Sequence, residues 1–423
     1  MKATSRVTAP PILALALFAF VAAPGMLLAQ GVPLGPEFRV NSYTTDTQND
    51  PSIASDSAGN FIIGWLSVNQ DGSVGGVFAQ RYASTGNPLG GEFRVNTYTT
   101  GVQGSPSVAA NSAGDFVVVW HSFQDGGGFG IFGQRYASSG APLGGEFRIN
   151  TYTTNLQQNP SAASDSAGNF VVVWDSVGQD YGGYGIVSQR YSSTGSPQGG
   201  EVVLTSGPNS NQDQRFPAVD RDSAGNFVVV WQGYSLAEFD GIHGQRFSSA
   251  GAPLGNLFRV NTYVTGSQYR PAVASDSTGN FVVAWESGHE GGAIFAQRYA
   301  SSGMPLGGEF RVNTFTVNFQ GFSSLAADSA GNFVVAWHSV LQDGSSFGVF
   351  AQRYASSGAP LGGEFRVNTY TTSGQLAPSV ASDPGGNFVI AWGSGTQDSS
   401  GYGVFAQRYN MIVPVELQDF RVE

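Results

Sequence analysis

The sequence predicts an all-β fold, a seven-bladed β-propeller with four antiparallel strands in each blade. Two observations carry the prediction. Tryptophan recurs at intervals of 52 to 57 residues, at Trp65, Trp120, Trp174, Trp231, Trp285, Trp337 and Trp392. Each copy of the repeat contains four short segments of strand character, the second of which ends near the tryptophan. Such a repeat is typical of propellers. The 59 glycines of the chain suit the many tight turns that this architecture needs.

The second copy of the repeat shows the four strands in order. We expect them at residues 106–110, 115–120, 131–136 and 146–150. A glycine-containing turn, Asn111 to Gly114, joins the first two segments as a hairpin. Because four strands in about 54 residues are too many for one β-helix coil and too few for an immunoglobulin-like sandwich, the repeat unit matches one propeller blade. The proline at the start of the first segment marks its first residue.

The second segment of each copy is apolar on both faces. In the second copy, Phe116, Val118 and Trp120 alternate with Val117 and Val119. A strand of this kind is buried on both sides, so we expect each sheet to be stacked between two others.

One strand type occurs once more than the others, which predicts how the ring closes. The EFR-type fourth segment begins eight times, at Glu37, Glu92, Glu146, Glu201, Leu257, Glu309, Glu364 and Asp419, whereas the other three segments occur seven times. A terminal EFR-type strand therefore completes the last blade and hides the sheet edges. We favour the N-terminal copy at Glu37; the C-terminal copy at Asp419 is the alternative.

The ends of the chain differ from the repeats. Residues 1–29 carry Lys2 and Arg6, an apolar run and a small-residue ending at Ala29, which predicts a bacterial signal peptide. The propeller then spans 30–410, and 411–423 is a C-terminal tail or the closing strand. We expect a secreted protein, extracellular or periplasmic. The absence of cysteine excludes disulfides and a lipid anchor.

The charge of the chain excludes some partners. The formal net charge is −11, and it becomes −13 once Lys2 and Arg6 leave with the leader. An acidic surface repels nucleic acid, and we expect no membrane insertion after leader cleavage. Neutral ligands and divalent cations remain compatible with it.

The phrases NFVVVW, VFAQRY and GGEFRVNTYTT carry a resemblance. With them, residues 35–409 resemble a tandem repeat of secreted bacterial proteins that are thought to form β-propellers. A fainter likeness, in Asp56 to Phe61, is to the Asp-box hairpin turn of sialidases, which is structural there. The resemblance implies the fold and assigns no activity to any residue.

Three polar series recur in the repeat, and we interpret them as mainly structural. The turn acids, with Asn111 in one copy, suit Asx turns; the arginines of the QRY motif suit ties to turn carbonyls or acids; and a glutamine precedes each first strand. The alternatives are a ring of cation ligands, an anion site and a polar channel mouth. The turn acids are Asp56, Asp165, Asp222, Asp276, Asp328 and Asp383; the arginines are Arg81, Arg135, Arg190, Arg246, Arg298, Arg353 and Arg408; the glutamines are Gln48, Gln103, Gln157, Gln214, Gln268, Gln320 and Gln375.

The loops that vary between copies, after the second strand and between blades, predict the ligand face. They carry aromatic and polar side chains that suit sugar recognition; the alternative is that the aromatics fold over their own loops. The candidate binding residues are Phe129, Tyr184, Tyr234, Phe239, Asp240, His289, Glu290 and Tyr402. We expect no cofactor, with weak calcium sites in the QD loops as the alternative, at Asp71, Asp125, Asp180, Asp343 and Asp398.

No catalytic motif stands out from the repeats, so the leading functional prediction is a non-enzymatic binding or structural module. Its partner would be an extracellular glycan or a cell-surface protein. The alternative is a polysaccharide-active hydrolase or lyase with its site on the variable face. That enzyme needs carboxylates from several blades, and the irregular acids are Glu238, Asp240, Glu286 and Glu290.

Overall fold

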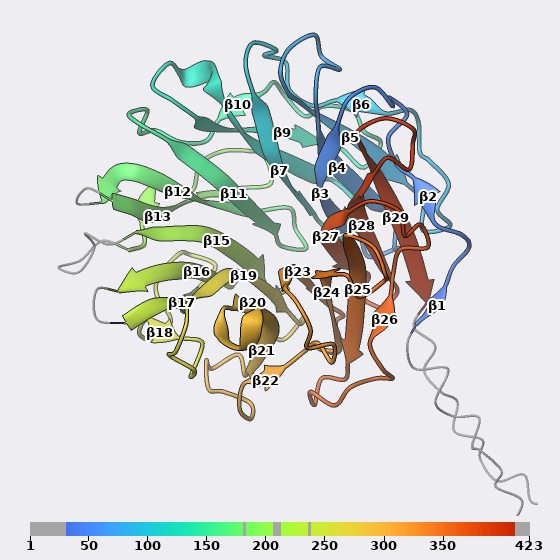
Figure 1. Cartoon of the computed structure of the whole chain (residues 1–423). Helices are drawn as coiled ribbons and strands as arrows, with labels where there is room; N and C mark the ends of the chain where they lie inside the picture. The colour runs from blue at the N-terminus through green and yellow to red at the C-terminus, as the bar shows by residue number, and fades with distance from the viewer. Residues whose placement is uncertain (1–30, 181–182, 206–212, 236–237, 411–423) are drawn as a thin grey trace, which may run out of the picture.

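The structure, a computed structural model, describes residues 31–180, 183–205, 213–235 and 238–410. It is a seven-bladed β-propeller, as the repeats predict, and its sheets surround one axis (Figure 1). Among the described residues, no helix is long and apolar enough to cross a membrane. The predicted leader and the predicted C-terminal tail fall on residues outside the described ranges.

The first three blades follow one pattern. Blade 1 contains β3 (Gln48–Ser55), β4 (Phe61–Ser67), β5 (Gly76–Tyr82) and β6 (Phe93–Arg94). Blade 2 contains β7 (Gln103–Ala110), β8 (Phe116–Ser122), β9 (Gly130–Tyr136) and β10 (Phe147–Arg148), with the short 3-10 helix η2 (Phe123–Asp125). Blade 3 contains β11 (Gln157–Ser164), β12 (Phe170–Asp180), β13 (Gly183–Tyr191) and β14 (Val202–Val203).

The next three blades repeat it. Blade 4 contains β15 (Gln214–Arg221), β16 (Phe227–Ser235), β17 (Glu238–Phe247) and β18 (Phe258–Arg259). Blade 5 contains β19 (Gln268–Ser275), β20 (Phe281–Ser287), β21 (Ala293–Tyr299) and β22 (Phe310–Arg311), with the short 3-10 helix η3 (His289–Gly291). Blade 6 contains β23 (Gln320–Ala327), β24 (Phe333–Val340), β25 (Phe347–Tyr354) and β26 (Phe365–Arg366).

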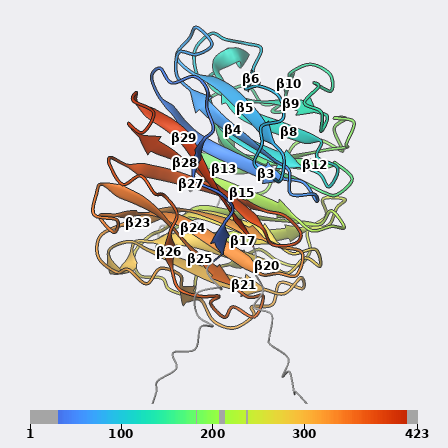
Figure 2. The same cartoon turned by 90° about the vertical axis from the view of Figure 1, so that its right-hand side faces the viewer.

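Blade 7 joins the two ends of the chain. It contains β27 (Gln375–Ser382), β28 (Phe388–Gly395) and β29 (Tyr402–Asn410), and β1 (Val32–Pro33) and β2 (Phe38–Arg39) pair with β29. The N-terminal copy therefore closes the ring, as we favoured. Figures 1 and 2 show the red strands of blade 7 beside the blue strands of blade 1.

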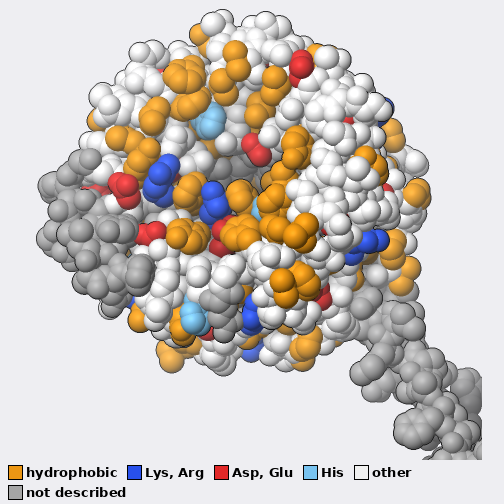
Figure 3. Space-filling view, viewed as in Figure 1, with side chains coloured by type: hydrophobic (Ala, Val, Ile, Leu, Met, Phe, Trp, Pro, Cys, Tyr) orange, Lys and Arg blue, Asp and Glu red, His pale blue; other side chains and the backbone are white. Residues whose placement is uncertain are grey.

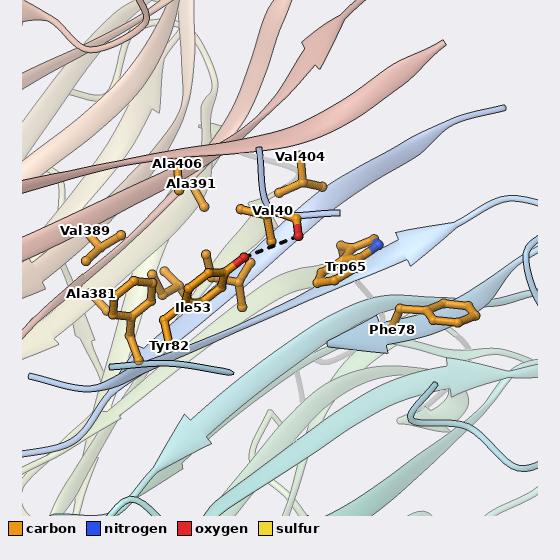
Figure 4. Packing of buried hydrophobic residues seen from close by; sticks show 12 residues of the cluster. Val40, Ile53, Trp65, Phe78, Tyr82, Ala381, Val389, Ala391, Val404 and Ala406 are labelled. Carbon is orange, nitrogen blue, oxygen red and sulfur yellow. Dashed lines mark hydrogen bonds between the residues drawn. The ribbon is translucent and has the colours of Figure 1, made fainter. Parts of the chain in front are cut away.

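The core lies between neighbouring blades. In blade 2, Phe116, Val118 and Trp120 pack against blade 1, while Val117 and Val119 pack against blade 3. All seven tryptophans are at most 1% exposed. The prediction of a second strand buried on both faces is confirmed. At the closure, Ala381, Val389, Ala391, Val404 and Ala406 of blade 7 meet Ile53 and Trp65 of blade 1, and the Tyr82 hydroxyl donates to the Val40 carbonyl at 3.3 Å (Figure 4).

Two strand boundaries differ from the prediction. Each inner strand begins at the glutamine, so the proline of six of these strands, and Ser323 of the remaining one, lies inside the strand, at a β-bulge where a ladder hydrogen bond is already missing. Each fourth strand pairs over only two residues, because a side chain takes over the next bond. In blade 1, Asn96 Oδ1 accepts from the Val77 amide at 2.7 Å; in blade 3 the Thr205 hydroxyl accepts from the Ile186 amide instead. Short edge strands protect a propeller from edge-to-edge association.

Ring closure can be tested at one carboxylate. Glu37 accepts from the Thr369 amide at 2.7 Å and from Gln397 at 2.6 Å, across the join; Glu92 makes the corresponding bonds to Ser42 and Gln70 within the continuous chain. We expect Glu37→Ala and Glu92→Ala each to lower the free energy of unfolding by about 1–3 kcal/mol, because each leaves donors unpaired. Urea unfolding measures both. A neutral Glu37→Ala beside a destabilising Glu92→Ala would contradict N-terminal closure.

Candidate functional site

The two ends of the central channel differ in how strictly the sequence repeats. The turns between first and second strands lie at one end. The loops after the second strands and the links between blades lie at the other, where they bond to one another: the Val68 amide donates to the Thr47 carbonyl, and the Gln157 amide donates to the Phe129 carbonyl. The prediction that the variable loops share one face is confirmed.

At this variable end, the third residue of every inner strand occupies an unusual backbone conformation. Its φ lies between 43° and 54° in all seven blades, at Asp50, Ser105, Asn159, Phe216, Arg270, Phe322 and Ala377. A positive φ is uncommon outside glycine and is an outlier for a bulky residue such as phenylalanine. A β-bulge accompanies each one. Strained positions and bulges of this kind gather at functional sites, where they aim side chains.

These seven residues, which we call the mouth ring, line one cavity. With the residues that follow them, they enclose about 380 Å³, within the range of ligand pockets. Their side chains include acidic, basic, polar, aromatic and small residues, whereas many positions of the repeat keep one residue type. Figure 3 shows a face that is hollowed near its centre, with hydrophobic, basic and acidic side chains around the hollow.

Arginine and aromatic side chains alternate along one side of the mouth ring. The Arg215 guanidinium carbon lies 4.1 Å from the centre of the Tyr184 ring and 5.2 Å from that of Phe216. The Arg270 guanidinium lies 5.2 Å from Phe216 and 4.1 Å from Phe322. This series, the arginine–aromatic ladder, runs from blade 3 to blade 6. Each cation is held over aromatic faces, which attract it through the ring quadrupole.

Two buried carboxyls lie beneath the ladder. Asp175 accepts from Asn159 Nδ2 at 3.1 Å and lies 3.7 Å from Arg215 Nε. Glu286 accepts from the Phe322 amide at 2.5 Å and lies 3.6 Å from Arg270 Nη1. Burial raises the pKa of Asp175 to about 7 and raises the pKa of Glu286, and in both cases the neighbouring arginine opposes the shift only in part.

A third carboxyl, Asp50, lies on the mouth ring itself. It is open to the hollow, yet the channel wall crowds it, and this desolvation raises the pKa of its carboxyl. Asp50, Asp175 and Glu286 belong to blades 1, 3 and 5. Three blades therefore each place a carboxyl at the variable end of the channel.

The sequence contains signals for these residues that we did not use. Asp175 and Glu286 both follow the blade tryptophan, a position that is otherwise Leu66, His121, Gln232, His338 and Gly393. Of the site acids, only Glu286 was among the irregular acids named from the sequence. Each mouth-ring residue is the third residue of its inner strand. In six blades it stands directly before the strand proline. Comparing the seven copies position by position would have found both series.

Two of the histidines also follow the blade tryptophan. His121 stacks on Phe129 at 4.2 Å, and His338 lies 4.8 Å from Phe322. Burial lowers the pKa of each to about 4, so both are neutral at pH 7.

The predicted binding residues lie in different places. Tyr184 belongs to the ladder. Phe129 folds back on Phe123 at 4.1 Å, His289 stacks on Tyr263 at 3.9 Å, and Asp240 accepts from Gln232 at 3.3 Å. Tyr402 opens β29 and is half-buried. The side chains of Tyr234, Phe239, Glu290 and Glu238 lie outside what the structure describes.

The QD loops are tied to the fourth strands. In five blades the glutamine donates to the EFR-type glutamate, as Gln124 does to Glu146 at 2.8 Å. Asp71, Asp125, Asp343 and Asp398 lie within 3.4 Å of an asparagine amide, and Asp180 accepts from the Thr205 hydroxyl. Among the described residues, no group of three histidine, aspartate or glutamate side chains could hold a metal ion. Calcium binding by these loops stays a prediction.

The repeated polar series play the structural roles that we expected. In all seven copies the turn acid or Asn111 accepts from the backbone amide four residues on. Six QRY arginines donate to a turn carbonyl of the next blade, as Arg190 does to Ser249 at 2.9 Å. Gln268 and Gln375 accept from blade tryptophans at 2.9 and 3.0 Å, and the glutamines are buried apart from Gln214.

Comparison with known proteins supports the fold. No family model and no curated protein matches the chain. A solved structure of a protein of unknown function from Dyadobacter fermentans is 10% identical, with a TM-score of 0.54, covering 90% of this chain and 98% of that one. The α-L-arabinofuranosidase of Fusarium graminearum with arabinobiose is 9% identical (TM-score 0.50; 88% and 98% covered). An α-L-arabinanase of Penicillium chrysogenum is 12% identical (TM-score 0.48; 88% and 98% covered). At such identities the likeness shows the fold alone.

These comparisons correct the leading functional prediction. The arabinofuranosidase named above is a glycosidase, which goes against the prediction of a non-enzymatic module; that module is not proposed again, and the polysaccharide-active alternative is taken up under the proposed function. The physical reason for the error lies in the ring. We nominated irregular acids mainly from the variable loops, whereas Asp50 and Asp175 lie on strands, at the mouth ring and after a blade tryptophan. The resemblance to the tandem repeat of secreted bacterial proteins stays a prediction.

The buried Asp175 makes stability depend on pH. Because its pKa is about 7 in the folded chain and near 3.8 when unfolded, the folded state binds the proton more tightly. The stabilisation is complete below pH 4 and is lost as the pH rises to 7, by up to about 4 kcal/mol. We expect the free energy of unfolding of Asp175→Asn to lack this component. Urea unfolding at pH 4.5 and 7.5 measures it, with Asp46→Asn, an exposed acid on the same face, as control. Parallel pH profiles for Asp175→Asn and the unmodified chain would contradict the assignment.

Proposed function

We propose that this protein is an extracellular hydrolase of glycosidic bonds, with its active site at the mouth ring. The observation that carries the proposal is that Asp50, Asp175 and Glu286, each with a raised pKa, all lie at the variable end of the channel. Glycosidases act through a pair of carboxyls, of which one must hold a proton near neutral pH. The glycosidases that share the fold support the proposal only as a precedent for the architecture.

Asp50 fits the role of general acid. It is open to the hollow, so it can reach a leaving-group oxygen, and desolvation shifts its pKa upward, in the direction that a general acid needs. Its positive φ of 50° fixes where the backbone aims the carboxyl.

Glu286 fits the role of the second carboxyl, which activates water or attacks the sugar. The Phe322 amide and Arg270 both favour its charged form, against the burial that raises its pKa. Asp175 holds Arg215 and Asn159 in place from below and acts on the ligand through them. The aromatic faces of Phe216, Phe322 and Tyr184 offer apolar surface to a sugar ring.

Localisation and partner follow from the sequence. The predicted leader and the absence of cysteine support export into a bacterial periplasm or medium. There the partner we propose is a glycan, and no nucleic acid.

Substitution of the carboxyls tests the proposal. We expect Asp50→Asn and Glu286→Gln each to lower kcat about 100-fold or more, since general acid–base catalysis supplies that factor. The measurement is the release of reducing ends from a panel of neutral and acidic plant and bacterial polysaccharides. Asp46→Asn removes an exposed acid from the same face and keeps full activity. An unmodified chain that cleaves no member of the panel, or variants as active as it, would contradict the proposal.

A further inference from the structure

Arginine is confined almost entirely to two positions of the repeat. Seventeen arginines follow residue 30; seven belong to the QRY motif and seven to the EFR-type segment. Only Arg215, Arg221 and Arg270 lie elsewhere, all in the inner strands of blades 4 and 5. The chain has no lysine after residue 2. These three cations are therefore the exceptions that the repeat does not explain.

Arg221 is used by the fold. It lies at the constant end of the channel with a nearly buried side chain, 4% exposed. Its guanidinium donates to the Asn169 carbonyl at 2.8 Å and to the Gly225 carbonyl at 2.8 Å, and pairs with Asp165 at 3.2 Å. Those partners account for its donors.

Arg215 and Arg270 are placed differently. Both lie at the variable end, and their side chains are 33% and 40% exposed. Each faces one carboxylate beneath it, at 3.7 and 3.6 Å, beyond ordinary hydrogen-bond length. A guanidinium has five N–H donors in a planar fork. Within the described part of the chain, the other nitrogens of both side chains have no acceptor. Arg270 lines the hollow, and Arg215 directly precedes Phe216, which also lines it.

The ladder holds both guanidinium groups ready for a ligand. Each lies over two aromatic rings, so little side-chain freedom is left to lose on binding. Both lie 5.2 Å from the centre of the same ring, Phe216, so one ligand can reach both. A carboxylate matches such a fork with two parallel hydrogen bonds, whereas a neutral sugar hydroxyl offers no charge.

We propose that the ladder arginines bind a carboxylate on the sugar, so that the substrate is a polysaccharide containing uronic acid. The inference deepens the proposed function and rests on it for the cleavage step, but not for binding. The net charge of −11 repels polyanions from the rest of the surface. Binding of an acidic sugar must therefore come from a local site.

Matched ligands test the proposal without hydrolysis. The probes are oligogalacturonate and its methyl ester, which share a backbone and differ in charge, with an arabinan oligomer and a sulfated galactan oligomer. Calorimetry uses the full chain carrying Asp50→Asn, so that cleavage does not interfere and the carboxylates beneath the ladder stay in place. We expect oligogalacturonate to bind at least about tenfold more tightly than its ester, as charged hydrogen bonds predict.

Variants identify the arginines as the cause. Arg270→Gln and Arg215→Gln abolish the preference for the acid over the ester, and Arg270→Lys, which keeps charge but loses the fork, restores it in part. Arg94→Gln removes an exposed arginine of the fourth strand and leaves the preference intact. A structural defect would weaken both ligands equally and leave their ratio unchanged, and that outcome would overturn the proposal.

The remaining outcomes separate the two proposals. Equal binding of acid and ester, tighter binding of the arabinan or sulfated oligomer, or no binding of oligogalacturonate would overturn the uronate inference. Saturable binding of oligogalacturonate with no cleavage of any polysaccharide by the unmodified chain would sustain it and overturn the hydrolase.

Discussion

The central strand of every blade must be covered on both faces, and the rest of the molecule follows from that constraint. Trp120 packs toward blade 1 while Val117 and Val119 pack toward blade 3, and the other blades do the same. An open row of such blades would leave two apolar faces in water. The ring removes both ends, and it needs β2 from the N-terminus to complete blade 7.

Every blade packs against a neighbour of the same structure. Most positions of the repeat therefore make the same contact in each blade and keep the same residue type. The QRY arginines, the turn acids and the QD loops all bond within a blade or to the next one. The mouth ring and the residue after each tryptophan are among the strand positions that vary. These two series face the variable end of the channel, so the ring that restricts the sequence elsewhere gathers the unrestricted positions in one place.

This division explains what the sequence could predict. Strand number, ring closure and the roles of the repeated polar residues follow from periodicity, since each is a property of one blade and its neighbour. The pairing of Asp175 with Arg215 and of Glu286 with Arg270 does not. It depends on a bulge that gives Phe216 and Arg270 a positive φ, and on the approach of strands from different blades. Loop aromatics such as Phe129 were predicted to bind ligand because they lie in variable loops, yet Phe129 packs on Phe123 of its own loop.

Side chains of the inner and second strands also bond one blade to the next. In five interfaces a serine hydroxyl accepts an amide of the next blade, as Ser52 does from Val108 at 2.9 Å. Blades 4 and 5 have Ala218 and Ala272 at that position. There Asp220 accepts from the Ser275 amide at 2.6 Å, and Glu286 accepts from the Phe322 amide.

Glu286 thus joins blade 5 to blade 6 at the same time as it faces Arg270. Its charge cannot change without changing the bond that fixes Phe322, and Phe322 is one of the rings that hold Arg270. The acidity of this carboxyl, the position of the ladder and the contact between two blades are therefore coupled. This coupling occurs in blade 5, where Ala272 replaces the serine that bonds to the next blade elsewhere and Glu286 makes the bond between blades instead. The proposed site therefore lies on this side of the ring.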